Sequence, residues 1–417
     1  MKRIKIIAVF AAAALLFSCS SAGKKDGPKE DKVKEGEGKM YWKDGSLRGV
    51  GQYKDYKKNG KWTLYYQMTG EKQGEGDYKD DEQHGPWIYF HKKGPKMAEG
   101  SFDAGQKTGE WVEFYETGQM FTKAAYVVSD VTVEGITSRV GGIEGIKKTF
   151  FLSGKVKSEE EYKKGLKNGI TREYYEDGKP KEFSQYRDNE YDGKVNKFHP
   201  NGRRSEESFY AAGKRQGKYD AYYDNGPASI TGQFEQNKQS GMWKFFARDN
   251  RVMKEGLYKE GREEGYWAFY EYVGGKSKFM DATITGGMIT GNCIVYKNGK
   301  KLGEGQLKQS IPKPQCVEKC DDCTECKTWS GKWIMPAKNG QWTEYFPDGT
   351  TKKIEANYML NKLNGEYKEY YPTGKIKAEG EYMTNKKNGE WKFYLQDGSV
   401  DEENSGRYMN DRKWKMK

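Results

Sequence analysis

The chain alternates polar residues with large aromatic residues in short segments that end at glycine-containing turns. No segment carries apolar residues at i, i+3 and i+4, as an amphipathic helix would, and glycine recurs too often for long helices. Asp-Gly and Asn-Gly pairs tolerate the positive φ that tight hairpin turns require. Five such pairs stand between the expected strands: Asp177-Gly178, Asn201-Gly202, Asn225-Gly226, Asp348-Gly349 and Asp397-Gly398. The pattern therefore predicts an all-β chain of antiparallel hairpins.

The pattern recurs with a usual period of 24 residues, and the stretch Asn364–Lys387 shows it in full. It opens with an Asn-Gly pair, turns at Thr373-Gly374 and continues as a second extended segment, Lys375–Met383. The residue five positions after the opening glycine is aromatic in all thirteen units. A unit this short cannot bury its own apolar face, so the units must stack on one another. The thirteen opening glycines are Gly60, Gly85, Gly109, Gly145, Gly169, Gly193, Gly217, Gly241, Gly265, Gly291, Gly340, Gly365 and Gly389.

Each unit is expected to supply two strands. The first runs from the second to the sixth residue after the glycine, as in Trp62–Tyr66, and the second surrounds the later aromatic residue, as in Glu75–Tyr78. The residue two past the glycine is usually large as well, and the departures from this rule are Lys147, Thr171, Val195 and Cys293. Positions two and five have opposite parity, which predicts that they point to opposite faces of a strand. Neighbouring units would cover one face, and an aromatic strip left exposed on the other would mark a binding surface.

Two intervals between units are longer than the rest. The 36-residue step contains Val127–Gly142, a stretch of β-branched residues that we interpret as an added hairpin, with a partner-facing loop as the alternative. The 49-residue step contains a cysteine cluster. Mean hydropathy is low, at −1.05, but 31 Tyr, 18 Phe and 11 Trp supply the burial that disordered chains lack.

The repeated pattern N-G-x-W-x-x-Y-Y-x-x-G-x-x-x-x-x-G-x-Y is clearest in Asn59–Tyr78, Asn364–Tyr382 and Asn388–Tyr408. It resembles the bacterial variant of the MORN repeat (membrane occupation and recognition nexus). The resemblance implies a twisted β-ribbon, an elongated array of about 13 hairpin repeats of 24 residues, that acts as a scaffold for proteins or membranes. Some bacterial relatives are antitoxin-like, whereas an exported protein would not reach a cytosolic toxin.

The N-terminus has the pattern of an export signal. Lys2, Arg3 and Lys5 precede twelve apolar residues, too few for a membrane span of roughly 20 but typical of a secretory signal. The sequence Leu16-Phe17-Ser18-Cys19 resembles the lipobox of bacterial lipoproteins, with an ordinary signal peptide as the alternative. The resemblance implies acylation of Cys19, for example by palmitate, and the serines after Cys19 favour the outer membrane, on its periplasmic or surface face.

These patterns divide the chain into five parts. We expect a lipoprotein signal peptide at 1–18, a flexible tether at 19–39, a MORN-like array at 40–308, a cysteine-rich insertion at 309–338 and a second MORN-like array at 339–417. The tether is polar and charged, and its residues cannot bury enough apolar surface to order themselves.

The cysteine cluster has the spacing C-x3-C-x2-C-x2-C and consists of Cys316, Cys320, Cys323 and Cys326. Disulfides are the first interpretation, because an exported protein meets an oxidising compartment. A zinc site and an iron–sulfur site are the alternatives, although four ligands this close together are unusual for zinc. Sequence does not choose between the three possible disulfide pairings. Cys293 is expected to be a small buried residue of the core.

No catalytic constellation stands out from the repeat. His84 takes the place of Asn in the Asn-Gly pair that opens a unit, which we interpret as a turn, and His199 lies beside the turn at Asn201-Gly202. Carboxylates recur at repeat positions, so we expect no enzyme activity, no cofactor and no metal. The formal net charge is +12, with lysines spread among acids, and export argues against nucleic acid as a partner.

The sequence therefore predicts a membrane-anchored lipoprotein of the cell envelope that acts as a repeat scaffold for a protein partner. The alternative is a binder of cell-wall glycan or host surface polymer through aromatic and lysine-rich faces. Weak attraction between the lysines and anionic lipid or polysaccharide is consistent with either function.

Overall fold

The computed structural model describes residues 33–92, 94–133, 136–270, 278–307, 313–319, 326–334 and 337–414, with the backbone alone for 133, 313–319 and 326–334. These residues form strands and turns and include no helix, so the all-β prediction is confirmed. Accordingly, the described part of the chain contains no helix long and apolar enough to cross a membrane. The predicted acylation site, Cys19, lies outside the described residues.

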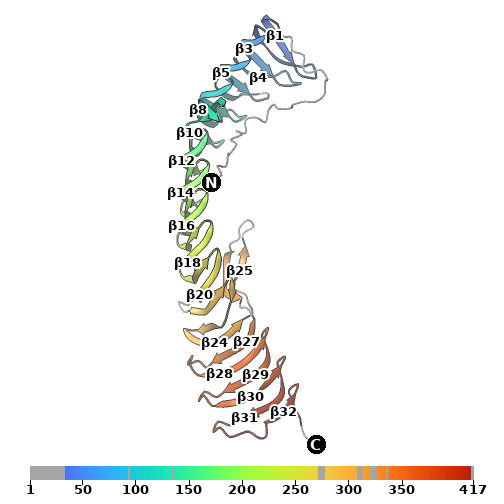
Figure 1. Ribbon diagram of the computed structural model, residues 1–417, viewed down its shortest axis with the longest axis vertical. Coiled ribbons are helices and arrows are strands. Elements are labelled where there is room, and N and C mark those ends of the chain that lie inside the picture. The colour runs from blue at the N-terminus through green and yellow to red at the C-terminus, as the bar shows by residue number, and fades with distance from the viewer. Residues whose placement is uncertain are drawn as a thin grey trace. The chain divides into compact units, whose positions relative to one another are not determined.

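The chain forms two compact units, Met1–Ile143 and Glu144–Lys417. In the first unit each strand pairs antiparallel with the strand before it and the strand after it (Figure 1). Its strands are β1 (Glu35–Tyr41), β2 (Leu47–Lys54), β3 (Lys57–Tyr65), β4 (Lys72–Lys79), β5 (Glu82–Phe90), β6 (Lys96–Asp103), β7 (Gln106–Phe114), β8 (Met120–Val133) and β9 (Ile136–Ile143).

The second unit has the same kind of arrangement, and Figure 1 shows its strands following one another in chain order apart from β25 and β26, which lie to one side. Its first strands are β10 (Gly145–Phe150), β11 (Val156–Lys163), β12 (Leu166–Tyr174), β13 (Pro180–Arg187), β14 (Glu190–Phe198), β15 (Arg204–Ala211), β16 (Lys214–Tyr222), β17 (Ala228–Glu235), β18 (Lys238–Phe246), β19 (Val252–Lys259), β20 (Arg262–Tyr270), β21 (Lys278–Thr285) and β22 (Met288–Ile289). The remaining strands are β23 (Cys293–Lys297), β24 (Lys300–Leu307), β25 (Lys313–Lys319), β26 (Cys326–Ile334), β27 (Lys338–Tyr345), β28 (Lys352–Met359), β29 (Lys362–Tyr370), β30 (Ile376–Met383), β31 (Lys386–Phe393), β32 (Gly406–Met409) and β33 (Arg412–Lys413).

Two kinds of turn join the strands. Within one 24-residue repeat, a turn such as Tyr175–Lys179 joins the first strand to the second; Tyr175 N donates to Lys179 O at 2.8 Å, and Gly178 takes φ +90°. The second strand is joined to the next unit by two residues that both have positive φ, such as Asp188 (50°) and Asn189 (71°). Positive φ at both central residues matches the twist of hairpin strands, which is why Asn, Asp and Gly recur there.

The interpretation of the opening Asn-Gly pair as a turn is wrong. Gly60 lies inside β3, which begins three residues earlier at Lys57, and β5 likewise contains His84. Gly60 takes φ +74° at a bulge, where Gln52 alone faces residues 59–61 of β3. A bulge needs a left-handed residue as a turn does, so the same Asn-Gly signal fits both.

The core is a row of tryptophans, each lying over a glycine of the preceding strand. Gly256 pairs with Trp267, and a Cβ built on Gly256 would lie 2.2 Å from Trp267 Cδ2. The tryptophans two past the opening glycine are all buried, as packing of units on one another predicts: Trp62, Trp87, Trp111, Trp243, Trp267, Trp342 and Trp391. Where a smaller residue replaces the tryptophan, the facing residue is larger than glycine, as in the pair Ser184 and Val195.

The aromatic residue five past each opening glycine lies on the other face and is half-buried in all thirteen units. Several of the tyrosines at this position donate their hydroxyl to a carboxylate fifteen residues earlier, as Tyr270 does to Glu255 at 2.6 Å. The opposite-face prediction is therefore confirmed. This second face therefore combines tyrosines that bond to carboxylates with half-buried phenylalanines such as Phe90 and Phe198.

Two segments differ from the regular repeat. The 36-residue step forms the predicted added hairpin, because β8 continues past its pairing with β7 and pairs with β9 from Tyr126 to Val133. Between β24 and β27, strands β25 and β26 pair only with each other among the described residues. At the N-terminus, β1 begins at Glu35, so residues 35–39 of the predicted tether lie in a strand that pairs with β2.

Candidate binding surfaces

Most conspicuous side chains of the repeat have structural roles. The residue six past the opening glycine reaches the next unit, as Tyr66 Oη donates to the Phe90 carbonyl at 2.8 Å. Histidine replaces tyrosine at this position twice, and the Nε2 atoms of His91 and His199 lie 3.0 Å and 2.9 Å from the equivalent carbonyls. A carbonyl only accepts, so Nε2 donates in both cases. These two histidines therefore belong to the hydrogen-bond ladder of the repeat.

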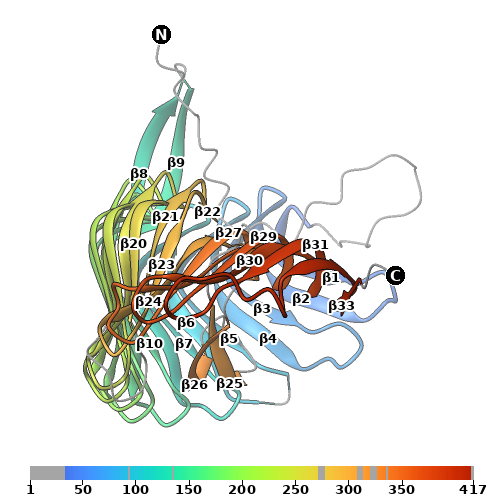
Figure 2. The ribbon, with the colours of Figure 1, turned by 90° about the horizontal axis from the view of Figure 1, so that it is seen from below.

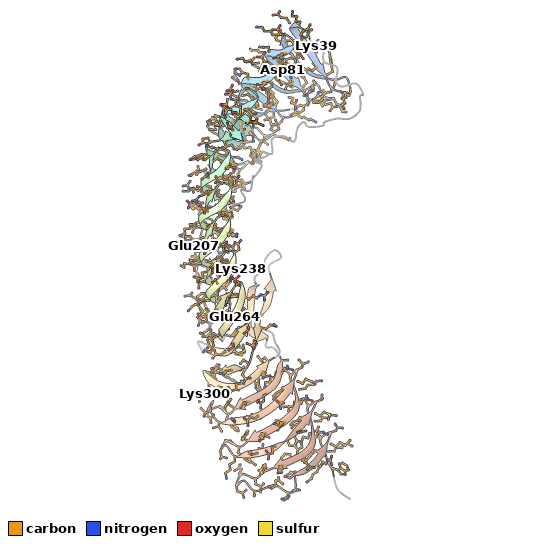
Figure 3. All side chains as sticks on the ribbon, viewed as in Figure 1. Lys39, Asp81, Glu207, Lys238, Glu264 and Lys300 are labelled. Atoms are coloured by element: carbon orange, nitrogen blue, oxygen red, sulfur yellow. The ribbon has the colours of Figure 1, made fainter. Side chains whose placement is uncertain are left out.

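The lysines are largely engaged within the chain too. Lys107 Nζ lies 4.1 Å from the centroid of Trp111, and Lys338 Nζ lies 4.8 Å from that of Trp342. On the opposite face, lysines pair with carboxylates of the neighbouring strand, as Lys244 does with Glu255 at 2.9 Å. Exposed lysines such as Lys238 lie at the turns, at the margins of the ribbon (Figure 3). Aromatic and lysine positions thus stabilise the array and leave little continuous surface for a polymer.

The β8–β9 hairpin, here called the arm, is a surface of a different kind. It extends past the other strands of the first unit, as Figure 2 shows, because β8 has 14 residues and the earlier strands have 7 to 9. Directly paired residues of antiparallel strands point to the same side, and side chains alternate along each strand. One side of the arm therefore presents Val127, Ser129 and Val131 together with Ile136, Ser138, Val140 and Gly142.

This side of the arm, here called the valine face, is exposed and carries no charge. Val131 is 45% exposed, Val127 and Val140 are each 48% exposed, and Ile136 is 72% exposed. The opposite side is polar, with Thr132 Oγ1 2.8 Å from Thr137 Oγ1 and with Asp130 paired to Arg139 in register. Arg139 also contacts Asp103 of the β6–β7 region at 2.6 Å, which holds the base of the arm. The arm is thus an amphipathic ribbon whose apolar side is left exposed by the described residues of this unit.

A cavity of about 330 Å³ is the second candidate surface. Within the second unit, its lining comes from β23, β24 and β27 and from the β28–β29 turn: Val295, Leu302, Gly303, Leu307, Lys338, Trp342, Glu344 and Asn361. Lys338 Nζ donates to Glu344 Oε1 at 2.6 Å, and Asn361 Oδ1 accepts the Lys338 backbone N–H at 2.7 Å. Apolar side chains and a neutralised ion pair therefore meet in one hollow.

Sequence reasoning located the added hairpin but not its exposed face, and it missed the cavity, although each leaves a signal. Uncharged residues at every second position, Val127, Ser129, Val131 and Val133, mark one side of a strand. Leu307 stands where most other units carry Tyr or Phe, such as Tyr78 and Tyr258, and this shorter side chain is the sequence signal of the cavity.

The predicted cysteine and metal chemistry is tested only in part. Cys293 is fully buried, its thiol lies 3.3 Å from the Gly305 carbonyl, and burial raises its pKa to about 12, so it is the inert core residue expected. Cys320 and Cys323 lie outside the described residues, and Cys316 and Cys326 are described by backbone alone, in β25 and β26. Across the side chains that the structure does describe, no group of three or more His, Cys, Asp or Glu could hold a metal ion.

The fold and its repeated contacts define a β-hairpin repeat protein, in which each unit covers its neighbour's aromatic residues. Five segments match the family described as the MORN repeat variant, at residues 34–55, 107–127, 143–164, 167–188 and 363–383. Each matched segment takes in strands of one hairpin, as 167–188 does with β12 and β13. These five segments are therefore similar to MORN repeats.

No curated protein matches the sequence. Solved structures to which the chain is similar include the TcdB2-TccC3-Cdc42 complex, at 9% identity and a TM-score of 0.14, covering 87% of this chain and 23% of that chain. A porin-like protein from Bacteroides uniformis matches at 10% identity and a TM-score of 0.12, covering 46% of this chain and 85% of that chain. With TM-scores this low, neither similarity carries an argument about fold or function.

Proposed function

We propose that this protein is a binding scaffold of the cell envelope that holds a protein partner on the valine face of its arm. The repeat supports a scaffold role, because many of its tyrosine, histidine and lysine side chains bond to other parts of the array and stabilise it. The arm supports the binding role, because uncovered β-branched side chains in water cost free energy that a partner would recover. The single observation that carries the proposal is the exposure of Val127, Val131, Ile136 and Val140 on one side of one ribbon.

The valine face also indicates the chemistry of the partner. The chain is 32% charged, yet this face carries only Val, Ile, Ser and Gly. A charged surface docked there would lose its hydration without gaining an ion pair. We therefore propose that the partner is a protein with an uncharged, apolar strand or sheet face. A glycan is a poorer fit to this surface, because sugar hydroxyls would meet few hydrogen-bonding groups there.

The location belongs to the same proposal. We propose that acyl chains on Cys19 anchor the protein at the outer membrane, because the N-terminal sequence resembles a lipoprotein signal. We also propose a binding protein and not an enzyme, since many carboxylates and tyrosines of the described repeats, together with His91 and His199, have structural partners. Replacing Cys19 by Ser should move the protein out of the membrane fraction and abolish incorporation of a palmitate analogue. Unchanged labelling of the variant would contradict the acylation at Cys19.

Partner binding is tested with two matched pairs of substitutions. Val131→Lys with Ile136→Lys charges the valine face, whereas Thr132→Lys with Thr137→Lys adds the same charge to the other side of the arm. Each full-length protein, extracted in detergent, is used to capture envelope proteins, which are compared by mass spectrometry. We expect a partner that the wild type and the threonine variant retain and the valine-face variant loses. Equal capture by both variants, or no partner with any of them, would refute the proposal.

A further inference from the structure

We propose that the cavity between β24 and β27 binds a terminal N-acetylhexosamine residue, the acetamido sugar of many glycans. The inference does not depend on the arm, which lies in the other unit. It rests on three observations. Leu307 departs from the repeat and opens the cavity, the Trp342 N–H has no hydrogen-bond partner among the described residues, and the charges of the lining cancel.

The cavity exists because Leu307 stands in an aromatic position of the repeat. In most other units this position holds a ring, and in several it packs edge-on against the next tryptophan, as Tyr258 does against Trp267 at 5.3 Å between centroids. Ile284 is the other exception, in the preceding unit. Leu307 pairs with Lys338 in the usual register, so it occupies the position of the ring. The backbone differs nearby, because Gly305 takes φ +156° whereas Gly256, its counterpart beside Trp267, has an ordinary φ. Leu307 is buried at 6% exposure, and the volume that a tyrosine would fill stays open beside it.

Trp342 differs from the other six buried tryptophans of the row. Each of those six donates its indole N–H to a backbone carbonyl, for example Trp267 to Leu257 O at 3.1 Å. Trp342 presents its Cε3 edge to Gly305 and its Nε1 to Gly303, where a built Cβ would lie 2.9 Å from Nε1. The ring is only 4% exposed, and no hydrogen bond joins Nε1 to the described part of the chain. Gly303 also lines the cavity, so the donor is buried beside the open volume.

These groups define the ligand. An indole N–H beside an open volume can donate to a carbonyl oxygen of a ligand bound there. Leu307 and Val295 offer an apolar contact for a methyl group next to that carbonyl. An acetamido group supplies the oxygen and the methyl together.

The polar side of the cavity suits the hydroxyls of a sugar ring. Lys338 and Glu344 neutralise each other, so Glu344 would repel an anionic ligand and Lys338 would repel a cationic ligand. A neutral ligand with several hydroxyls is repelled by neither side chain and can form hydrogen bonds with Lys338, Glu344 and the Nδ2 hydrogens of Asn361. A volume of about 330 Å³ lies at the lower end of the range of ligand pockets, which suits one sugar unit.

The test uses the full-length chain in detergent and two probes, N-acetylglucosamine and glucose, measured by saturation-transfer NMR and by calorimetric titration. N-acetylglucosamine should bind at one site per chain with a dissociation constant of about 1 mM, and glucose should bind at least about tenfold more weakly. Absence of N-acetylglucosamine binding, or equal binding of glucose, would overturn the assignment.

Two variants place the binding in this cavity. Leu307→Tyr restores the usual residue of the repeat, so the protein should remain folded by circular dichroism and lose binding by more than about tenfold. Trp342→Phe keeps the ring and removes the N–H, and should weaken binding about fivefold. Affinity unchanged in both variants would show that the sugar binds elsewhere.

A matched control tests whether an open cavity is sufficient for binding or whether the Trp342 N–H is also needed. Tyr382→Leu makes the same exchange beside Trp391, whose N–H already donates to Glu381 O at 3.0 Å. This variant should still bind one sugar per chain, and a second site would refute the role given to the Trp342 N–H. Charging the valine face should leave sugar binding unchanged, so failure of the scaffold proposal and failure of this one give different results.

Discussion

At the scale of single residues, size complementarity between glycine and tryptophan builds the core. Gly256 has an ordinary φ, so its lack of a side chain is needed for space and not for backbone freedom. Trp267 occupies that space and is fully buried. The chain itself shows the alternative packing, since Ser184 faces Val195 in an otherwise similar register. Two different pairs of residues thus fill one position of the repeat.

Replacing Gly256 by Ala should therefore destabilise the second unit by about 3 kcal/mol, because the new Cβ overlaps the Trp267 ring. The urea midpoint of unfolding, followed by circular dichroism, measures the effect. Gly94→Ala is the control, since its Cβ would have no neighbour nearer than 3.6 Å and its φ is ordinary. Adding Trp267→Val to a Gly256→Ser variant should recover part of the loss. A double variant that is as unstable as the sum of its parts would contradict size complementarity.

Burial of tyrosine makes the first unit sensitive to alkali. Burial raises the pKa of Tyr78 to about 12, above the ordinary value of 10.0. A raised pKa means that the folded protein keeps the proton which the unfolded chain loses, so stability is constant below pH 10 and falls between pH 10 and 12. Tyr78→Phe should reduce the stability lost between pH 8 and pH 11, as measured by urea unfolding. The same loss in the variant and the wild type would show that Tyr78 does not carry this dependence.

At the scale of elements, each hairpin is tied to the next by a ladder of side-chain bonds to backbone carbonyls. Tyr175 Oη donates to Phe198 O at 2.8 Å, and Tyr223 and Tyr371 make the same bond in their units. The turns and bulges set the register in which these bonds can form, because each uses residues that accept positive φ. The arm is an exception, because β8 continues beyond its pairing with β7. Among the described residues, no neighbouring hairpin covers the part of the arm beyond that pairing.

Removing one rung of this ladder should have a small and local effect. Tyr175→Phe deletes one hydrogen bond while keeping the ring, and should cost about 1 kcal/mol in the free energy of unfolding. Tyr56→Phe is the control, because Tyr56 is 56% exposed in the turn between β2 and β3. Equal stability of the two variants would mean that the ladder contributes nothing to holding neighbouring hairpins together.

At the scale of the whole molecule, the repeats of β12 to β19 each pair with the repeat before and the repeat after, so this part of the array can be shortened by whole repeats. Deleting residues 193–216 joins Asp192 to Gly217 and removes 24 residues, one full period of two strands. Each remaining strand then keeps an antiparallel neighbour with the same register. Deleting only residues 193–204 removes half a period and leaves the next strand in the wrong direction.

The 24-residue deletion should therefore keep the β-sheet circular dichroism spectrum and a cooperative melting transition, whereas the 12-residue deletion should lose them. Thermal unfolding of the two variants beside the wild type is the measurement. A folded 12-residue deletion, or an unfolded 24-residue deletion, would show that the units are not interchangeable modules.

Much of the fold of this protein could be predicted from its sequence, because the same pattern of glycine and aromatic residues occurs thirteen times. Period, strand alternation and glycine-containing turns give the all-β hairpin array, the buried tryptophans and the added hairpin. The opening Asn-Gly pair lies at a bulge and not at the predicted turn, and sequence does not separate the two because both require a residue with positive φ. The cysteine cluster, the acylation of Cys19 and the domain limits stay predictions.

The sequence by itself determined which side chains share a face, since that follows from periodicity along one strand. Only the tertiary structure decided which faces are covered, because coverage depends on what lies beside a strand in space. For that reason Val127 and Val140 prove to be exposed although they are apolar. The direction of the Trp342 ring is likewise visible only in the structure, because it packs on Gly303 and Gly305 of β24, a strand that the insertion separates from β27 in the chain.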